Sequence, residues 1–266
     1  MSLMAKTANF AVVVRPPKVM KSKLGELASR FLNRGTLKQL LTACAINPLE
    51  DVHLVIISGD VTSNFSTVFA KGSFTKESVD NCVGKLQSAL PSVKVARTGD
   101  IVELSMGELK LYARWIIGGV LASPIKARVD MSKLAGPSNE LSAKFASFTA
   151  DAFVSFAATG AALKDERAGM LVNKLPGDAR PTQAHGNLVI DNGLKLDVSA
   201  GMPSAAAAKK AQTTFQEVLD GLKKLPVVSN FIGGAKLEAV GSDVRLSFAL
   251  SDDQITMLMA MAKMVM

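Results

Sequence analysis

The stretch VKVARTGDIVELS at residues 93–105 occurs again, in altered form, as AKLEAVGSDVRLS at residues 235–247. The two stretches align without gaps, five of their thirteen positions are identical, and their apolar residues alternate in the same phase. Alternation with a period of two on both sides of a glycine predicts two strands joined by a tight turn. The sequence therefore predicts an internal repeat in which this strand pair recurs.

The segments that precede the two strand pairs also correspond. Residues 83–91 and 218–226 each form an amphipathic helical pattern that ends at Leu-Pro, where the proline stops the helix. The second copy holds seven more residues between helix and strand, roughly at positions 227–233. Further back, the apolar run 10–14 resembles the run 153–157, and each is expected to be the first strand of its copy.

Each copy is thus predicted to run β-α-β-β-α-β-β. Strands in this order form antiparallel or mixed sheets with helices packed on one face, so the predicted fold class is α+β. We expect a first repeat over residues 4–125, a connector over residues 126–150 and a second repeat over residues 151–266. The sequence leaves open whether the copies are separate domains or share one sheet.

Short polar motifs predict where several elements begin and end. Asp191-Asn-Gly lies between two alternating runs, which is a strong signal for a hairpin turn. Thr36-Leu-Lys-Gln and Ser251-Asp-Asp-Gln have the spacing of capping boxes. In a capping box, the side chains at the two ends of the motif bond the free N–H groups of a helix start. We therefore expect helices to begin at both motifs.

Composition excludes several classes of protein. Hydrophobic residues make up 48% of the chain and charged residues 20%, which is typical of a folded protein rather than a disordered one. The longest nearly apolar run, residues 115–124, is shorter than the roughly 20 residues that cross a bilayer, so no transmembrane segment is predicted. Two His and two Cys are too few for the usual closed zinc sites. One Trp and one Tyr argue against nucleic-acid binding by base stacking.

The net charge of +8 is concentrated near the start of the sequence. Residues 1–49 hold eight basic residues and one acid, whereas the remainder holds 23 basic and 22 acidic residues. On a helix, Lys23, Arg30 and Arg34 fall within about 40° of one another, and Lys38 follows closely. One interpretation is a solvated helix face, and the other is a surface for phosphate, an anionic envelope lipid or an acidic partner.

Cys44 and Cys82 are the two cysteines, and both lie in the first copy. A disulfide between them would close a loop of about 40 residues and contribute roughly 4 kcal/mol. Two cysteines on helices of one subdomain favour a disulfide and export to an oxidising compartment. The alternative is a pair of buried free thiols in a cytoplasmic protein.

Residues typical of catalysis occur without their partners. His53 and His185 border apolar strands and are interpreted as edge or surface residues. Ser-x-x-Lys occurs at Ser73 and Ser123 without a supporting set of motifs. The sequence also has no phosphate-binding glycine loop and no His-Glu-x-x-His motif. We therefore predict a non-enzymatic protein without catalytic, cofactor-binding or metal-binding residues. The alternative is an enzyme whose active site is assembled from residues scattered over loops.

The last ten residues are rich in methionine. Met257, Met261 and Met264 follow the i, i+4, i+7 spacing of a core-facing helical stripe. Two alternatives are an adaptable surface for a protein partner and a site for soft Cu(I).

Four stretches resemble large, mostly uncharacterised families of exported bacterial proteins. They are residues 40–53, with the pattern Asn-Pro-Leu-x-Asp-Val, and residues 191–196, 205–211 and 244–254. The resemblance implies secretion or lipoprotein anchoring and implies no catalytic residues. The first residues include no anchoring cysteine and no charged segment before an apolar one, so we expect any signal segment to lie outside this sequence.

Together these observations predict a non-enzymatic exported module, periplasmic or associated with the outer envelope. It would bind an envelope component, such as an anionic surface, or a protein partner. Two alternatives stay open. The first is a carrier of a lipid or other apolar ligand held between sheet and helices. The second is a cytoplasmic, nucleic-acid-associated protein that uses the basic N-terminal helix, although the scarcity of aromatic residues argues against nucleic acid.

Overall fold

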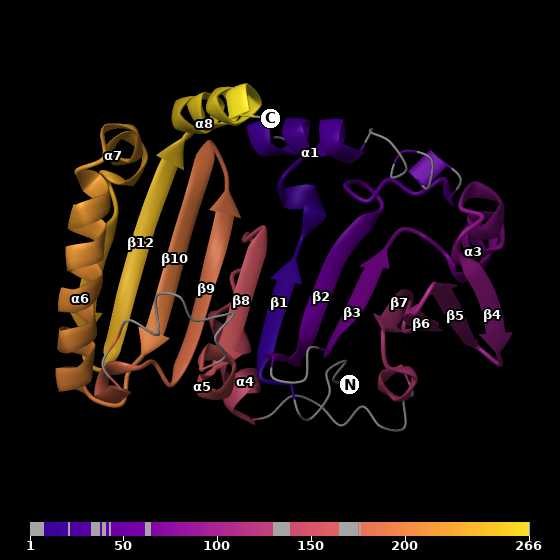
Figure 1. The fold of residues 1–266 in the computed structure, drawn as a ribbon, viewed down its shortest axis with the longest axis horizontal. Helices are drawn as coiled ribbons and strands as arrows, with labels where there is room; N and C mark the ends of the chain where they lie inside the picture. The colour runs from indigo at the N-terminus through magenta and orange to yellow at the C-terminus, as the bar shows by residue number, and fades with distance from the viewer. Residues whose placement is uncertain are drawn as a thin grey trace. The chain divides into compact units, whose positions relative to one another are not determined.

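The computed structural model describes residues 8–20, 22–32, 38, 41–42, 44–61, 65–129, 139–164, 175 and 177–265. Contacts divide the chain into two compact units, Met1–Ser138 (unit 1) and Asn139–Met266 (unit 2). Figure 1 labels the helices and strands of both units. The α+β class predicted from the sequence is confirmed, and the paired strands of each unit are antiparallel.

Unit 1 consists of an antiparallel sheet, two α-helices and two short 3-10 turns among its described residues. The strands are β1 (Phe10–Val14), β2 (Val52–Asp60), β3 (Phe65–Gly72), β4 (Lys94–Thr98), β5 (Ile101–Met106), β6 (Leu109–Ile116) and β7 (Gly119–Ser123). The helical elements are η1 (Pro16–Lys18), α1 (Lys23–Leu32), α3 (Lys76–Ala89) and η3 (Lys126–Arg128). The strands are ordered β1-β2-β3-β7-β6-β5-β4.

The two faces of this sheet are covered differently. One face carries a core of Phe69, Leu121 and Val129, which is closed by the segment that follows β7. The opposite face lies under α3, where Val83 of the helix and Val102 of β5 are both buried. The alternation along each strand therefore places α3 over one apolar face.

Unit 2 begins with short helical elements and continues with a five-stranded sheet and its helices, among the residues described. The strands are β8 (Val154–Thr159), β9 (Gln183–Ile190), β10 (Gly193–Gly201), β11 (Lys236–Val240) and β12 (Asp243–Ser251). The helical elements are α4 (Asn139–Lys144), η5 (Phe145–Ser147), α5 (Gly160–Leu163), η7 (Gly177–Ala179), α6 (Ala205–Lys223), α7 (Pro226–Ile232) and α8 (Asp252–Val265). The strands are ordered β8-β9-β10-β12-β11.

Alanines determine how α6 packs in unit 2. Ala207, Ala208 and Ala211 form one buried stripe of the helix, and they contact Val244 of β12 in the main core of the unit. Small side chains let the helix lie close to the sheet, as Figure 1 shows for α6 beside β12. Ser204 caps the start of α6 by accepting a hydrogen bond from the N–H of Ala207 at 3.1 Å.

The motif predictions are confirmed where the structure describes the residues. The hairpin turn lies between Ile190, the last residue of β9, and Gly193, the first residue of β10. At the start of α8, the Ser251 N–H donates to Gln254 Oε1 at 2.9 Å and the Gln254 N–H donates to Ser251 Oγ at 3.3 Å. The capping box predicted at residues 36–39 lies outside the described residues.

The strand orders of the two units coincide once β6 and β7 are set aside. Unit 1 then runs β1-β2-β3-β5-β4, and unit 2 runs β8-β9-β10-β12-β11. The hairpin β6–β7 lies between β3 and β5, whereas β12 pairs directly with β10. Unit 2 also has a helix, α7, that the sequence did not predict within its longer connection.

The β6–β7 turn contains a residue in an unfavourable backbone conformation. Ile117 and Gly118 have φ angles of 48° and 70°, both in the left-handed region. Such two-residue turns favour Asn-Gly, because a β-branched residue is strained at positive φ. Since the Ile117 side chain is 54% exposed, substitution removes little packing.

We expect Ile117→Asn to raise the free energy of unfolding by about 1 kcal/mol, because asparagine tolerates this conformation. Urea denaturation followed by the fluorescence of Trp115 measures the change. Ile117→Val retains the β-branch and is expected to leave stability near that of the parent. An asparagine variant no more stable than the valine variant would contradict the prediction.

Candidate functional site

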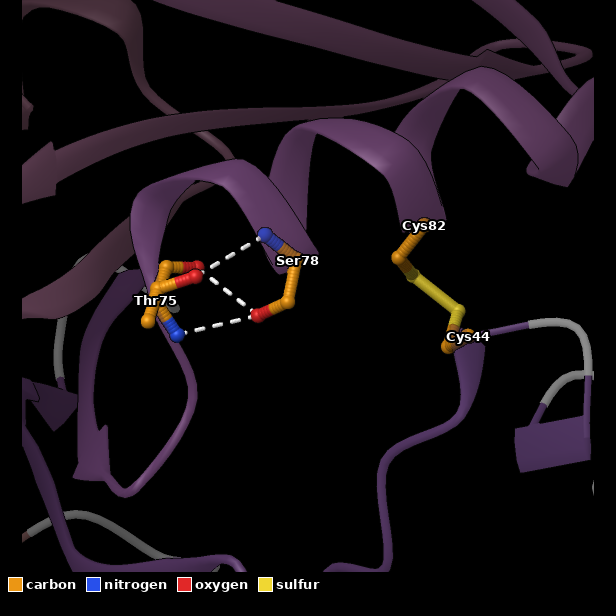
Figure 2. Close-up of a disulfide and its surroundings, with 4 residues drawn as sticks. All are labelled: Cys44, Thr75, Ser78 and Cys82. Atoms are coloured by element: carbon orange, nitrogen blue, oxygen red, sulfur yellow. Dashed lines mark hydrogen bonds between the residues drawn. A yellow bond between two sulfur atoms is a disulfide. The ribbon is translucent and has the colours of Figure 1, made fainter.

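The first half of α3 is capped at its start and contacts β4 of the unit 1 sheet. Thr75 and Ser78 form a capping box, with N–H to Oγ distances of 3.2 and 2.9 Å (Figure 2). One turn later, Asp80 accepts hydrogen bonds from Lys76 at 2.6 Å and from Arg97 of β4 at 2.9 Å. These two bonds hold the pKa of Asp80 below its usual value. The start of the helix is therefore fixed over β4.

Cys82 attaches the middle of α3 to the segment before β2. Its sulfur forms a disulfide with Cys44, with a distance of 4.2 Å between the Cα atoms (Figure 2). The pairing predicted from the sequence is therefore confirmed. Such a bond is typical of proteins that fold in an oxidising compartment.

The Asn-Pro-Leu-x-Asp-Val pattern at residues 47–52 forms a closed turn. Asn47 Oδ1 accepts a hydrogen bond from the Leu49 N–H at 3.1 Å, and Asp51 Oδ2 accepts one from the Asn47 N–H at 2.7 Å. The Asp51 N–H donates to the Asn47 carbonyl at 2.7 Å. The polar side chains of this pattern therefore satisfy the backbone that leads into β2.

An apolar groove lies beneath the second half of α3. Its volume is about 320 Å³, and six residues of α3, β5 and β6 define what we call the α3 groove: Leu86, Leu90, Leu104, Met106, Leu109 and Leu111. Leu109, Met106 and Leu111 are 69%, 49% and 40% exposed. Exposed apolar residues gathered in one hollow are a mark of an interaction site.

The α3 groove is open because the chain returns from helix to sheet too soon to cover it. Only Pro91 and Ser92 separate Leu90, which caps α3, from Val93. The Val93 N–H donates to the Leu90 carbonyl at 2.9 Å, which closes the turn tightly. The sequence did not indicate this groove, because alternation in β5 and β6 predicts a buried face and does not show where the covering helix ends.

A second hollow, of about 240 Å³, lies on the polar face of the unit 2 sheet. His185 of β9 borders it, and its buried Nδ1 has no hydrogen-bond partner among the described residues. Burial lowers the pKa of His185 below its usual value, and the positive charge of Lys144 lowers it further. Across the same hollow, Glu238 pairs in register with Arg245. This balance of opposite charges is that of a solvated sheet face.

The two histidines differ in their placement. His53 lies at a register irregularity of β2 and is exposed, as the sequence predicted. His185 was predicted at an edge or surface. It is not at an edge, because β9 pairs with β8 on one side and β10 on the other, but it is half-buried and borders the hollow on one face of the sheet. The apolar neighbours of His185 could not reveal this position, because strand order is not readable from one strand.

The basic stripe is described in part. Lys23 and Arg30 are exposed on α1, and Lys23 contacts Glu26 at 3.3 Å. Lys38 is also exposed, whereas Arg34 lies outside the described residues. A contact between exposed charges such as Lys23 and Glu26 contributes little to stability.

The methionine stripe of α8 does not face a core at its first position. Met257 is 50% exposed, and Ile255 is the residue that the helix buries. Met261 is half-buried, and the side chain of Met264 lies outside the described residues. The spacing predicted that Met257 faces the core. Instead Ile255, two residues earlier and therefore on another side of the helix, is the residue that faces the core.

The described residues also bear on membrane spanning and on metal binding. No helix in the ranges given above is long and apolar enough to cross a membrane. In the same part of the chain, His, Cys, Asp and Glu side chains do not gather in groups of three or more that could hold a metal ion.

Comparison with known proteins finds solved structures of similar fold. No family model matches the chain, and the curated proteins give no match either. Among solved structures, crystal form I of TP0453 is similar with a TM-score of 0.58 and 11% identity, covering 97% of this chain and 94% of that chain. Crystal form III of TP0453 has a TM-score of 0.60 and 12% identity, covering 95% and 94%. At this identity the likeness shows the fold alone.

The disulfide is expected to stabilise unit 1, because it closes a loop between residues 38 positions apart. The double variant Cys44→Ser/Cys82→Ser should lose about 2–4 kcal/mol of unfolding free energy, measured by urea denaturation. Reduction of the parent protein with dithiothreitol is the matched control and should give the same loss. Equal midpoints for the parent and the double variant would contradict the prediction.

Proposed function

We propose that the chain is a non-enzymatic binding module that works outside the cytoplasm and engages a protein partner through the α3 groove. The observation that carries this proposal is the groove itself, in which Met106, Leu109 and Leu111 expose apolar surface on a helix-covered sheet. Apolar residues that are this exposed cost free energy in water unless a partner covers them.

Two observations support the other parts of the proposal. The Cys44–Cys82 disulfide supports export, since cytoplasmic thiols are kept reduced. The hollow beside His185 in unit 2 supports a role without catalysis, because the buried Nδ1 of His185 makes no hydrogen bond to a neighbouring hydroxyl among the described residues. A catalytic base would be set within hydrogen-bond reach of the group it activates.

The shape of the groove favours a protein over a carried lipid. Sites for small ligands enclose most of the ligand surface, whereas the α3 groove leaves Leu109 and Met106 largely open to solvent. A protein surface that covers the groove would bury these side chains, which makes a protein the better fit.

Site-specific photocrosslinking tests this function in the cells that produce the protein. We expect p-benzoylphenylalanine in place of Leu109 to give a light-dependent adduct of higher mass, because the side chain lies in the contact. The same group in place of Val240 is the matched control, since Val240 is an exposed apolar residue beside the β11–β12 turn.

An adduct formed at Leu109 and absent at Val240 supports the proposal. Equal adducts at both positions, or none at either, would overturn it. Circular dichroism of both purified variants establishes that each remains folded.

The basic face of α1 supports a second candidate function, the binding of an anionic envelope surface. Lys23 and Arg30 are exposed and seven residues apart, so they project from the helix within about 20° of each other. A basic helix face is attracted to anionic lipid at low ionic strength, and the attraction falls as salt screens it.

Arg30→Glu is then expected to weaken binding to phosphatidylglycerol vesicles about tenfold at low salt, because each basic residue near such a surface contributes about 1 kcal/mol. Vesicle flotation at low and physiological salt measures the change. Lys209→Glu removes an exposed cation from α6 and serves as the charge-matched control. Equal flotation of the two variants would leave the stripe as a solvated helix face.

A further inference from the structure

The connection between helix and strand differs between the two units. In unit 2, α6 is followed by α7 (Pro226–Ile232) and two glycines before β11 begins. Proline at the first position of α7 starts the helix, since its missing N–H is not needed there. In unit 1, α3 is likewise followed by a Leu-Pro pair. There, however, only Pro91 and Ser92 lie between Leu90 and Val93.

The short helix α7 covers apolar surface of its own unit. It packs against α6 and β12, and its Phe231 is only 7% exposed. The carbonyl of Asn230 on α7 also accepts a hydrogen bond from the Gln254 side chain at the start of α8. These contacts hold α7 in place beside the end of β12.

The strand that α7 contacts, β12, corresponds to β5 in the floor of the α3 groove. The alignment of residues 93–105 with residues 235–247 places Leu104 opposite Leu246, and one step further places Met106 opposite Phe248. Leu104 and Met106 lie on the face of β5 that carries Val102 beneath α3. Leu246 and Phe248 lie on the face of β12 that carries Val244 beneath α6.

We propose that the α3 groove receives a short amphipathic helix from a partner protein, in the place that α7 occupies in unit 2. A large apolar side chain of that helix takes the role of Phe231 and packs between Leu90, Met106 and Leu109. This inference rests on the proposed binding function and names the form of the partner. Helices that lay one apolar face in a groove are a common mode of recognition.

Charge around the groove favours acidic residues beside the apolar face of that helix. Lys85 precedes the groove residue Leu86 on α3 and is exposed. It has no ion pair within the described part of the chain, whereas Lys76 at the start of the same helix already bonds Asp80 at 2.6 Å. An acidic residue in the partner would complement Lys85 and guide the partner's approach.

A graft tests the shape of the groove without any partner. Insertion of VVSNFIG, the sequence of residues 227–233, between Pro91 and Ser92 gives unit 1 the connection of unit 2. A matched graft carries Ser in place of the copied Phe231. We expect the first graft to melt about 4 °C higher than the second, because only its phenyl ring fills the groove. Equal melting temperatures of two folded grafts would overturn the inference.

Photocrosslinking from position 109 then tests the partner in producing cells. The phenylalanine graft should lower the yield of adduct at least tenfold relative to the serine graft, and mass spectrometry should identify a peptide with apolar residues at i, i+3, i+4 and i+7. Met106→Glu places a charge in the groove and should lower the yield of adduct similarly. Val240→Glu places the same charge outside the groove and should not.

The outcomes separate the two proposals. An adduct of the parent protein that both grafts retain, or an adduct that proves to be a lipid, overturns the helical partner. A partner peptide without helical periodicity does the same while leaving the binding function intact. Absence of any adduct from the parent protein overturns the binding function itself.

Discussion

The short connection between α3 and β4, residues 90–93, constrains what unit 1 presents to solvent. Pro91 ends the helix, and Val93 is already bonded to Leu90, so the chain enters the sheet before it can cover the outer ends of β5 and β6. The Asp80–Arg97 contact joins the first half of the helix to β4, and the Cys44–Cys82 bond joins its middle to the segment before β2. A helix fixed at one end and cut short at the other leaves a groove beneath its last turns.

With a longer connection, unit 2 covers more of the corresponding surface, while Leu222 and Leu225 remain 42% and 51% exposed there. There α7 fills the space beside β12, and Phe231 removes apolar surface from water. The two units therefore show alternative solutions to one packing problem. In unit 2 the chain supplies the cover, and in unit 1 we infer that another molecule supplies it. The cover in unit 2 therefore supports an interaction site at the groove of unit 1 more strongly than the exposed leucines of the groove do alone.

The basic stripe and the α3 groove lie on different elements of unit 1. Lys23 and Arg30 belong to α1, whereas the α3 groove belongs to α3, β5 and β6. Charged side chains on a solvated helix are common and change the free energy of folding little. Three large apolar residues exposed in one hollow raise the free energy of the protein in water. For this reason the groove, more than the basic stripe, carries the proposed function.

The sequence by itself determined the α+β class, the Asp191-Asn-Gly hairpin, the capping box at Ser251 and the cysteine pair, because each depends on local chemistry or on alternation along one segment. It did not reveal the α3 groove, the place of His185 in an inner strand or the exposure of Met257. Each of these depends on which element lies over a residue. Spacing gives the direction of a side chain from its own helix or strand, but only tertiary packing decides whether another segment covers it.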